Sequence, residues 1–431
     1  MTKHLITAAL LTAGTILPGA AQLSAYDANS PLGWGAMPGF EVTGGAGGVE
    51  VVVTTEAEFD AAINNHRDPV TRERDQPVII YVKGDVEFTS MHTYHTKNKT
   101  ILGLPGARIF SKDRTKKNSG VLKFTSGSGS DSENIIIRNL TIQGAGAYDV
   151  DGDDALLFQG VKRVWVDHCT IGDGVDSSLD CNHESDYICI SWCRFLYQIP
   201  PLAGGSGGAN DHRFCNTWGS SDSDTSSLGH LNTTFANCWW DQGCMERCPR
   251  VRFGKVHLLN CYYTNTGNHY SIGYGYKSNI YAEKCWFADG VIVDKDYTEP
   301  KKGYGDYNLQ ITDCHNAPDK TQRVGDIDYF IPADYYDYTS FPLDLVPSVV
   351  GNEQTGAGAN LMVEVGLGVT GYADGDSGSQ SALDTPSAPA VDSVEYHNLL
   401  GMPLSAPAQG INILTEHLSD GSTRTRLIMH R

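Results

Sequence analysis

Residues 164–171 read Val-Trp-Val-Asp-His-Cys-Thr-Ile, and variants of this stretch recur along the middle of the chain. Each variant alternates apolar residues, continues with a polar residue and an Asn or Cys, and ends in an apolar or aromatic position. In order, the variants are IIIRNLTI, VWVDHCTI, ICISWCRF, TTFANCWW, VHLLNCYY, IYAEKCWF and LQITDCHN. A period of two is typical of a β-strand, so Val164 and Val166 are expected to face away from Trp165.

The spacing of these variants predicts the fold class. The residues that mark them are Asn139, Cys169, Cys193, Cys238, Cys261, Cys285 and Cys314. The successive spacings are 30, 24, 45, 23, 24 and 29 residues, and we interpret the 45 as two turns of the shorter period. Repeats of this length with one short strand each indicate a solenoid. We predict an all-β, single-stranded, right-handed parallel β-helix from about Gly39 to about Val349, with long loops on one side.

Four alternating runs nearer the N-terminus fit earlier coils, namely VEVVVTT, PVIIYVKG, KTILGL and SGVLKFTSG. Between them, residues 56–65 (EAEFDAAINN) have the character of a short helix near the N-terminal end. The end strands of a solenoid expose unpaired backbone groups and need covering.

The cysteines fit the same architecture. Equivalent residues of a parallel β-helix stack about 4.8 Å apart on successive coils, which predicts an internal ladder of small, weakly polar thiols. A zinc site would favour CxxC pairs, but Cys189/Cys193 and Cys244/Cys248 are each one residue too far apart. The total of 11 is odd, which argues against a full disulfide framework, although one or two disulfides stay possible in an exported protein.

Length and charge limit the function. The chain has 431 residues, and 40% of them are hydrophobic, which is enough to bury a core. Its 51 acidic and 32 basic residues leave a formal net charge of −19. A protein with this negative net charge is not expected to bind nucleic acid through its overall electrostatic field. A polyanion would need a local basic patch or a bridging cation.

The two ends of the chain differ from the middle. Residues 1–25 begin with Lys3 and His4, continue with an apolar run and end in small residues, which predicts an export signal and a secreted protein without a membrane span. We expect residues 26–360 to form one domain and 361–392, rich in Gly, Ser, Asp and Pro, to be a linker. Residues 393–431 resemble tails that guide secretion, with a docked strand pair as the alternative. We expect a monomer.

One basic segment stands out from the acidic background. Residues 247–255 (RCPRVRFGK) carry four positive charges. On a strand, Arg250 and Arg252 share the outer face, while Val251 faces the core. Pro249 suits a strand start, and Arg247 is then expected to project from the turn before it. A solvated basic edge is the alternative interpretation.

One acidic segment also stands out. It contains Asp149, Asp151, Asp153 and Asp154, and it is followed by Asp176 and Asp180. If one coil separates the first group from the second, these carboxylates stack on neighbouring turns and repel each other unless a cation joins them. Calcium suits such an all-oxygen set, whereas Asx turns are the alternative explanation.

Together, these segments give the chain its resemblance to the pectate lyases of polysaccharide lyase family one, over roughly residues 30–360. Its most specific parts are residues 164–168 (VWVDH), 185–192 (SDYICISW) and the run Arg247-x-Pro249-x-x-Arg252-x-Gly254-x-x-His257. The resemblance implies Ca²⁺-dependent β-elimination of polygalacturonate, or pectin, without nucleic acid as a partner.

The resemblance also implies roles for single residues. Arg247 matches the arginine that removes the C5 proton, and Arg252 matches the arginine that binds the substrate carboxylate. Asp176 and Asp180 match a calcium pair, Asp154 a third ligand, and Asp151 or Asp153 could replace a ligand that falls on Gly152. Arg250 lies between the matched arginines and is taken as substrate-binding. The lysine that the family carries after the SDY strand is missing, and we suggest His212 and Arg213 as substrate-binding replacements.

The implied base makes the reaction pH-dependent. Free arginine has a pKa above 12, so its neutral form is costly at ordinary pH and activity is expected to rise above neutrality. Rival functions are a pectin lyase acting on methyl-esterified polymer without calcium, a polygalacturonase-type hydrolase with paired carboxylates, and a non-catalytic pectin-binding module.

Overall fold

The computed structural model describes residues 26–27, 29–64, 76–115, 118–127, 131–148, 151–203, 211–365, 370–371, 391–397, 403–406, 410–418 and 423–430. The predicted export signal, Asp149 and most of the predicted linker lie outside the described residues. The chain forms two compact units, residues 1–365 with 372–378 and residues 366–371 with 379–431.

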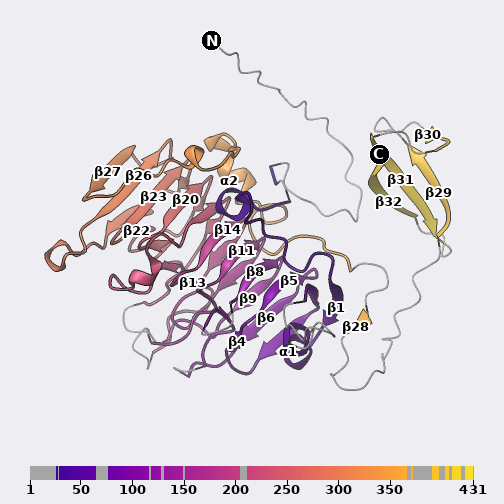
Figure 1. The fold of residues 1–431 in the computed structure, drawn as a ribbon, viewed down its shortest axis with the longest axis horizontal. Helices are drawn as coiled ribbons and strands as arrows, with labels where there is room; N and C mark the ends of the chain where they lie inside the picture. The colour runs from indigo at the N-terminus through magenta and orange to yellow at the C-terminus, as the bar shows by residue number, and fades with distance from the viewer. Residues whose placement is uncertain are drawn as a thin grey trace, which may run out of the picture. The chain divides into compact units, whose positions relative to one another are not determined.

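Three sheets build the first unit (Figure 1). In pairing order, the first sheet contains β27 (Lys320–Val324), β26 (Tyr307–Thr312), β23 (Ser278–Glu283), β20 (Lys255–Leu259), β17 (Thr233–Ala236), β14 (Asp186–Ser191), β11 (Lys162–Asp167), β8 (Glu133–Arg138), β5 (Lys97–Gly103), β2 (Val78–Val82) and β1 (Val49–Val53). The second contains β25 (Asp294–Asp296), β22 (Ile272–Tyr274), β19 (Arg250–Val251), β16 (Thr217–Trp218), β13 (Leu179–Asn182), β10 (Leu156–Gln159), β7 (Leu122–Thr125) and β4 (His92–Tyr94). The third contains β24 (Trp286–Phe287), β21 (Tyr262–Tyr263), β18 (Trp239–Trp240), β15 (Arg194–Leu196), β12 (Thr170–Gly172), β9 (Thr141–Gln143), β6 (Arg108–Ser111) and β3 (Asp85–Phe88).

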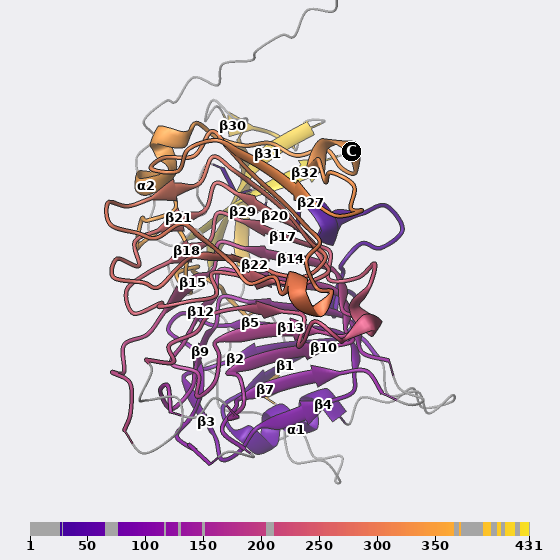
Figure 2. The same cartoon turned by 90° about the vertical axis from the view of Figure 1, so that its left-hand side faces the viewer.

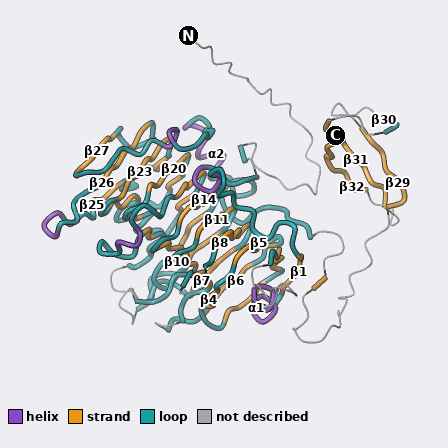
Figure 3. Tube along the Cα trace, viewed as in Figure 1, coloured by secondary structure: helices purple, strands orange, loops and turns teal. Residues whose placement is uncertain are grey.

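The chain contributes one strand to each sheet in turn, and each strand from β1 to β26 pairs in parallel with its equivalents in neighbouring coils (Figures 2 and 3). This is the predicted parallel β-helix. Its interior is apolar because alternate side chains of every strand point inward. Val164 and Val166 are fully buried in that interior, whereas Trp165 packs on the other face with Val42 and Cys189.

The two ends of the first unit are covered differently. Helix α1 (Glu56–Asn64), close to the predicted residues 56–65, buries Phe59, Ala62 and Ile63 beside the N-terminal strands (Figure 1). At the other end, β27 pairs antiparallel with β26 and is largely exposed. The other helical turns are η1 (Gly33–Ala36), η3 (Thr225–Ser227), η4 (Pro300–Lys302), η5 (Pro332–Asp334), η6 (Leu343–Leu345) and α2 (Val346–Val349).

The second unit holds an antiparallel sheet of β30 (Pro403–Leu404), β29 (Val391–His397), β31 (Gly410–Leu418) and β32 (Thr423–His430), and the short β28 (Thr370–Gly371) precedes it in the chain. A role of this region in secretion stays a prediction. None of the helices in the described part of the chain is long and apolar enough to cross a bilayer.

The register of the first sheet corrects two predictions. β14 pairs directly with β17, with Ile188 beside Thr233, so the spacing of 45 is one coil with long excursions and not two turns. Arg138 pairs with Asp167, which places Leu140, not Asn139, beside Cys169. Asn139 is instead equivalent to His168, and both have left-handed backbones, with φ of 55° and 45°. The prediction that Asn139 occupies the same position as the cysteines is therefore wrong. Asn139 occupies the position before them, where the left-handed backbone suits Asn.

The predicted thiol ladder is confirmed. Cys169, Cys193, Cys238, Cys261 and Cys285 are fully buried at equivalent positions, and Cys314 ends the row half-buried. Each thiol lies within hydrogen-bonding distance of backbone carbonyls, as Cys193 does with Val166 O at 3.5 Å. All the cysteines are described and free, so the alternative with disulfides is not realised in this structure.

The VWVDH segment serves the fold. The fully buried Asp167 accepts hydrogen bonds from Arg138 Nε at 2.6 Å and Ser191 Oγ at 2.6 Å, and it lies 2.8 Å from His168 Nδ1. Burial alone would raise the pKa of Asp167, but these partners hold it below the ordinary value. The carboxylate therefore stays ionised within the protein.

Replacing Asp167 by alanine should lower the free energy of unfolding by about 3–5 kcal/mol, because it leaves the partly buried Arg138 and the fully buried His168 without the carboxylate that both contact. Chemical denaturation measures the loss. Asp85→Ala is the control, since Asp85 pairs with Arg108 at the surface, where such pairs contribute about 0–1 kcal/mol. Equal losses in the two variants would contradict this account of the VWVDH segment.

Candidate active site

The outer face of the second sheet carries the predicted site. One outward row runs through Leu157, Asp180, Thr217, Arg250, Gly273 and Lys295. The residues next to them, Phe158, Cys181, Trp218 and Val251, are fully buried in the core. The alternation of these short strands thus holds the polar row outside while their apolar neighbours anchor it.

Arg247 projects from the turn before β19, as predicted, and its backbone has φ of 59°. Its Nη1 donates to Thr217 Oγ1 at 3.0 Å, and its Cζ lies 4.2 Å from the ring centroid of Phe214. Its Nε is buried and has no hydrogen-bond partner in the described structure. The Arg247 guanidinium is therefore held in place but forms no ion pair with a carboxylate of the described residues.

Arg250 is also held without a carboxylate. Its Cζ lies 4.1 Å from the ring centroid of Tyr297, and its Nε is buried without a partner among the described residues. Burial, together with the nearby charge of Arg252, lowers the pKa of Arg250 to about 10. An anion bound here would restore the solvation that this cation has lost.

Arg252 lies deeper, with 8% of its surface exposed. Its Nε donates to Asp222 Oδ1 at 2.7 Å and its Nη1 to Gly219 O at 2.8 Å. Asp222 belongs to the excursion between β16 and β17, so that excursion fixes the arginine in place.

The carboxylates meet on neighbouring coils, as predicted. Ala155 N donates to Ser177 O at 2.9 Å, which sets Asp154 next to the turn that carries Asp176. Burial raises the pKa of Asp154 well above its ordinary value, and the charges of Asp180 and Asp176 raise it further. Burial also raises the pKa of Asp180 to about 6, with Asp176 as the next cause.

These aspartates differ in how they are held. Asp180 accepts from Ser177 Oγ at 2.6 Å and from Thr217 N at 2.8 Å. Asp176 hydrogen-bonds with His212 Nε2, and the His212 ring packs on Phe214 with centroids 3.8 Å apart. The buried Asp154 Oδ1 has no partner in the described structure.

The donor chemistry fits a hard cation. Hard divalent cations prefer carboxylate oxygens, and here mutually repelling carboxylates include an unpartnered buried oxygen. Asp153 has a second unpartnered oxygen and acts on Asp154, whereas Asp151 is exposed. Among the described residues, no group of three or more His, Cys, Asp or Glu side chains has the geometry to hold a metal ion as it stands. Calcium binding therefore stays a proposal.

The structure separates the two suggested replacements for the missing lysine. His212 is buried against Asp176, where it positions a carboxylate. Arg213 is paired with Asp211, to which its Nη2 donates at 2.6 Å, and this pairing raises the pKa of Arg213. Its guanidinium thus already has a local carboxylate, and a role for Arg213 in substrate binding stays a prediction.

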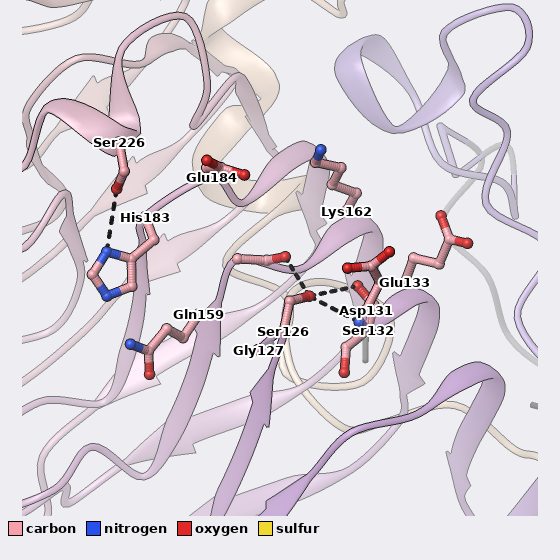
Figure 4. A pocket seen from close by; sticks show the side chains of 11 residues that line it. Ser126, Gly127, Asp131, Ser132, Glu133, Gln159, Lys162, His183, Glu184 and Ser226 are labelled. Atoms are coloured by element: carbon pink, nitrogen blue, oxygen red, sulfur yellow. Dashed lines mark hydrogen bonds between the residues drawn. The ribbon is translucent and has the colours of Figure 1, made fainter. Parts of the chain in front are cut away.

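A recess of about 320 Å³ lies over the arginines. Its lining is Asp222, Arg250, Arg252, Asp296, Tyr297, Thr298 and Glu299. A larger recess of about 500 Å³ lies at the ends of β7, β10 and β13, where Lys162, His183 and Glu184 line it among serines (Figure 4). None of the predicted site residues lines the larger recess. The smaller one is lined by two of them, Arg250 and Arg252, which were predicted to bind substrate.

Sequence reasoning missed Thr217 and Phe214, the residues that touch Arg247. The one feature that could have identified them is their register: Thr217 lies one coil after Asp180, and Phe214 lies one coil after Ser177. That position becomes visible only when the excursion after β15 is recognised as part of a single coil.

The fold and this arrangement define a parallel β-helix protein with a site for an anionic ligand. The family model for pectate lyase matches residues 2–319. The chain therefore belongs to the pectate lyase family. It is an enzyme that cleaves pectate by a lyase reaction.

Individual relatives support this family assignment. A pectate trisaccharide-lyase of Thermotoga sp. (strain RQ2) is 27% identical over 392 residues, covering 82% of this chain and 95% of the relative. Pectate lyase A of Aspergillus niger is 28% identical, covering 62% and 74%. A solved pectate lyase of Bacillus sp. N165 in complex with trigalacturonate is similar in fold, with a TM-score of 0.54, 21% identity and coverage of 77% and 99%.

Proposed function

We propose that this enzyme is exported and cleaves polygalacturonate by calcium-dependent β-elimination, with Arg247 taking the C5 proton of a galacturonate unit. One observation carries the proposal. Thr217 joins the guanidinium of Arg247 to the carboxylate of Asp180, so the basic and acidic groups face one stretch of the sheet.

Each group has a part in the reaction. Arg252 and Arg250 bind substrate carboxylates, while Asp154, Asp176 and Asp180 would hold the calcium ion. The ion would supply positive charge to the substrate carboxylate, which becomes more negative as the C5–H bond breaks. The C5 proton passes to a neutral guanidine of Arg247, and the electron pair of that bond forms the C4–C5 double bond. The glycosidic oxygen leaves C4 with its bonding pair and takes up a proton, so no water is consumed.

Digestion of de-esterified and methyl-esterified polymer, followed by ultraviolet absorption with and without a chelator, tests the proposal. We expect absorption from the conjugated double bond with the de-esterified polymer, loss of nearly all activity with the chelator and recovery with Ca²⁺. Activity should rise above neutral pH, because a neutral arginine becomes less costly there.

Other outcomes would assign other functions. Preference for the esterified polymer without a need for calcium would indicate a pectin lyase. New reducing ends without ultraviolet absorption would indicate a hydrolase.

A further inference from the structure

Thr217 has a central place among the site residues. It is buried, with 8% of its surface exposed, and begins the short strand β16. The next residue, Trp218, is fully buried and donates from Nε1 to Thr233 Oγ1 at 2.7 Å. The backbone at Thr217 is thus fixed by an anchored neighbour, which makes its side chain a well-defined reference point.

The two polar groups of Thr217 serve different partners. Its backbone N donates to Asp180 Oδ1 at 2.8 Å. Its hydroxyl oxygen accepts from Arg247 Nη1 at 3.0 Å. A substitution of the side chain can therefore remove the contact to the arginine and keep the contact to the aspartate.

Arg247 has few other restraints. The ring of Phe214 lies under its Cζ at 4.2 Å, and its Nε is unpartnered in the described structure. A ring face limits how the planar guanidinium can tilt, but it does not fix rotation within the plane. The hydrogen bond to Thr217 supplies that second restraint, since it holds one particular nitrogen.

We propose that Thr217 is a positioning residue whose hydroxyl fixes the rotation of the Arg247 guanidinium for proton abstraction, an inference that rests on the proposed function above. Proton transfer requires the base nitrogen within hydrogen-bonding reach of the proton, and a displacement of about 1 Å can cost about a hundredfold in rate. Substrate binding depends mainly on Arg250 and Arg252, so the loss should fall on kcat and not on KM.

The test compares Thr217→Val, Thr217→Ser and Thr217→Ala with Thr125→Val in the full chain. Valine keeps the shape of threonine and lacks its hydroxyl, whereas serine keeps the hydroxyl. Thr125 is the matched control because it lies on the same sheet with the same 8% exposure. Steady-state kinetics on polygalacturonate with Ca²⁺ give kcat and KM, and thermal unfolding reports folding.

We expect Thr217→Val to lower kcat roughly ten- to a hundredfold with KM within about twofold. Thr217→Ser should stay within about threefold of the wild type, and Thr125→Val should equal it. If the valine variant does not fold, the same kcat loss is expected of the alanine variant. A wild-type kcat in a folded variant without the hydroxyl, or a serine variant as slow as the valine variant, overturns the inference. Loss of the proposed function is recognised separately, because Arg247 variants would then keep their turnover.

Discussion

Replacing Arg247 by alanine should lower kcat on polygalacturonate roughly a thousandfold, within the range expected when a general base is removed. Polymer binding should change only a few fold, because the variant keeps Arg250 on β19 and Arg252 directly after it. Arg247→Lys should also be severely impaired. Lysine keeps a charge, but it lacks the planar fork that meets Thr217 and the ring of Phe214 together.

Initial rates of ultraviolet absorption at saturating polymer measure kcat, and a separate binding assay measures affinity. Arg323→Ala is the control, because Arg323 also lies over an aromatic ring, 4.6 Å from the centroid of Tyr329, but on the end strand β27. An Arg247→Ala enzyme that keeps most of its turnover would remove Arg247 from the reaction. Equal losses of binding and turnover would make it a substrate-binding residue instead.

The strands and the basic face were predictable because they depend on local alternation. The period of two within a strand is enough to place Val164 and Val251 in the core and Arg250 on the outer face. A shift of one residue in the strand register would expose the apolar side chains and bury the polar ones, which is costly. The local alternation therefore decides which face of the strand is buried. The stacked thiols followed from the same argument, since equivalent positions of a solenoid must lie above one another.

The position of the coils was harder to predict where the chain leaves the sheets. Between Leu196 and Thr233, the described residues form only two regular elements, the two-residue β16 and the 3-10 turn η3, so the spacing suggests two short coils. A long excursion costs little because loop-closure entropy grows slowly with length. Spacing alone therefore cannot separate one long coil from two short ones.

The same excursion explains what was missed in the site. It brings Phe214 and Thr217 beside Arg247, but neither residue type signals chemistry in a sequence. Arg213 looked like the better candidate because of its charge. In the structure Asp211, two residues earlier, already pairs with it.

Asp154→Asn should have opposite effects on the metal-free and calcium-bound protein. Without metal, the variant should be more stable than the wild type, because burial, and then the charges of Asp180 and Asp176, disfavour the ionised carboxylate of Asp154, whose Oδ1 has no partner in the described structure. The melting temperature should rise by about 2 °C for each kcal/mol of repulsion that is removed. Calcium affinity should fall tenfold or more, since a neutral amide replaces a charged oxygen that has no other described partner.

Thermal unfolding in chelator and over a calcium titration measures both effects, because an ion that binds the folded state raises the melting temperature in proportion to its binding free energy. Asp186→Asn is the matched control: Asp186 is also buried, but it accepts from Asn232 N at 3.0 Å and lies outside the acidic group. That variant should gain no stability in chelator and keep the full calcium-induced rise. A wild-type calcium response in Asp154→Asn would exclude Asp154 as a ligand. A fall in its metal-free stability would show that repulsion among these aspartates is not what the cation relieves.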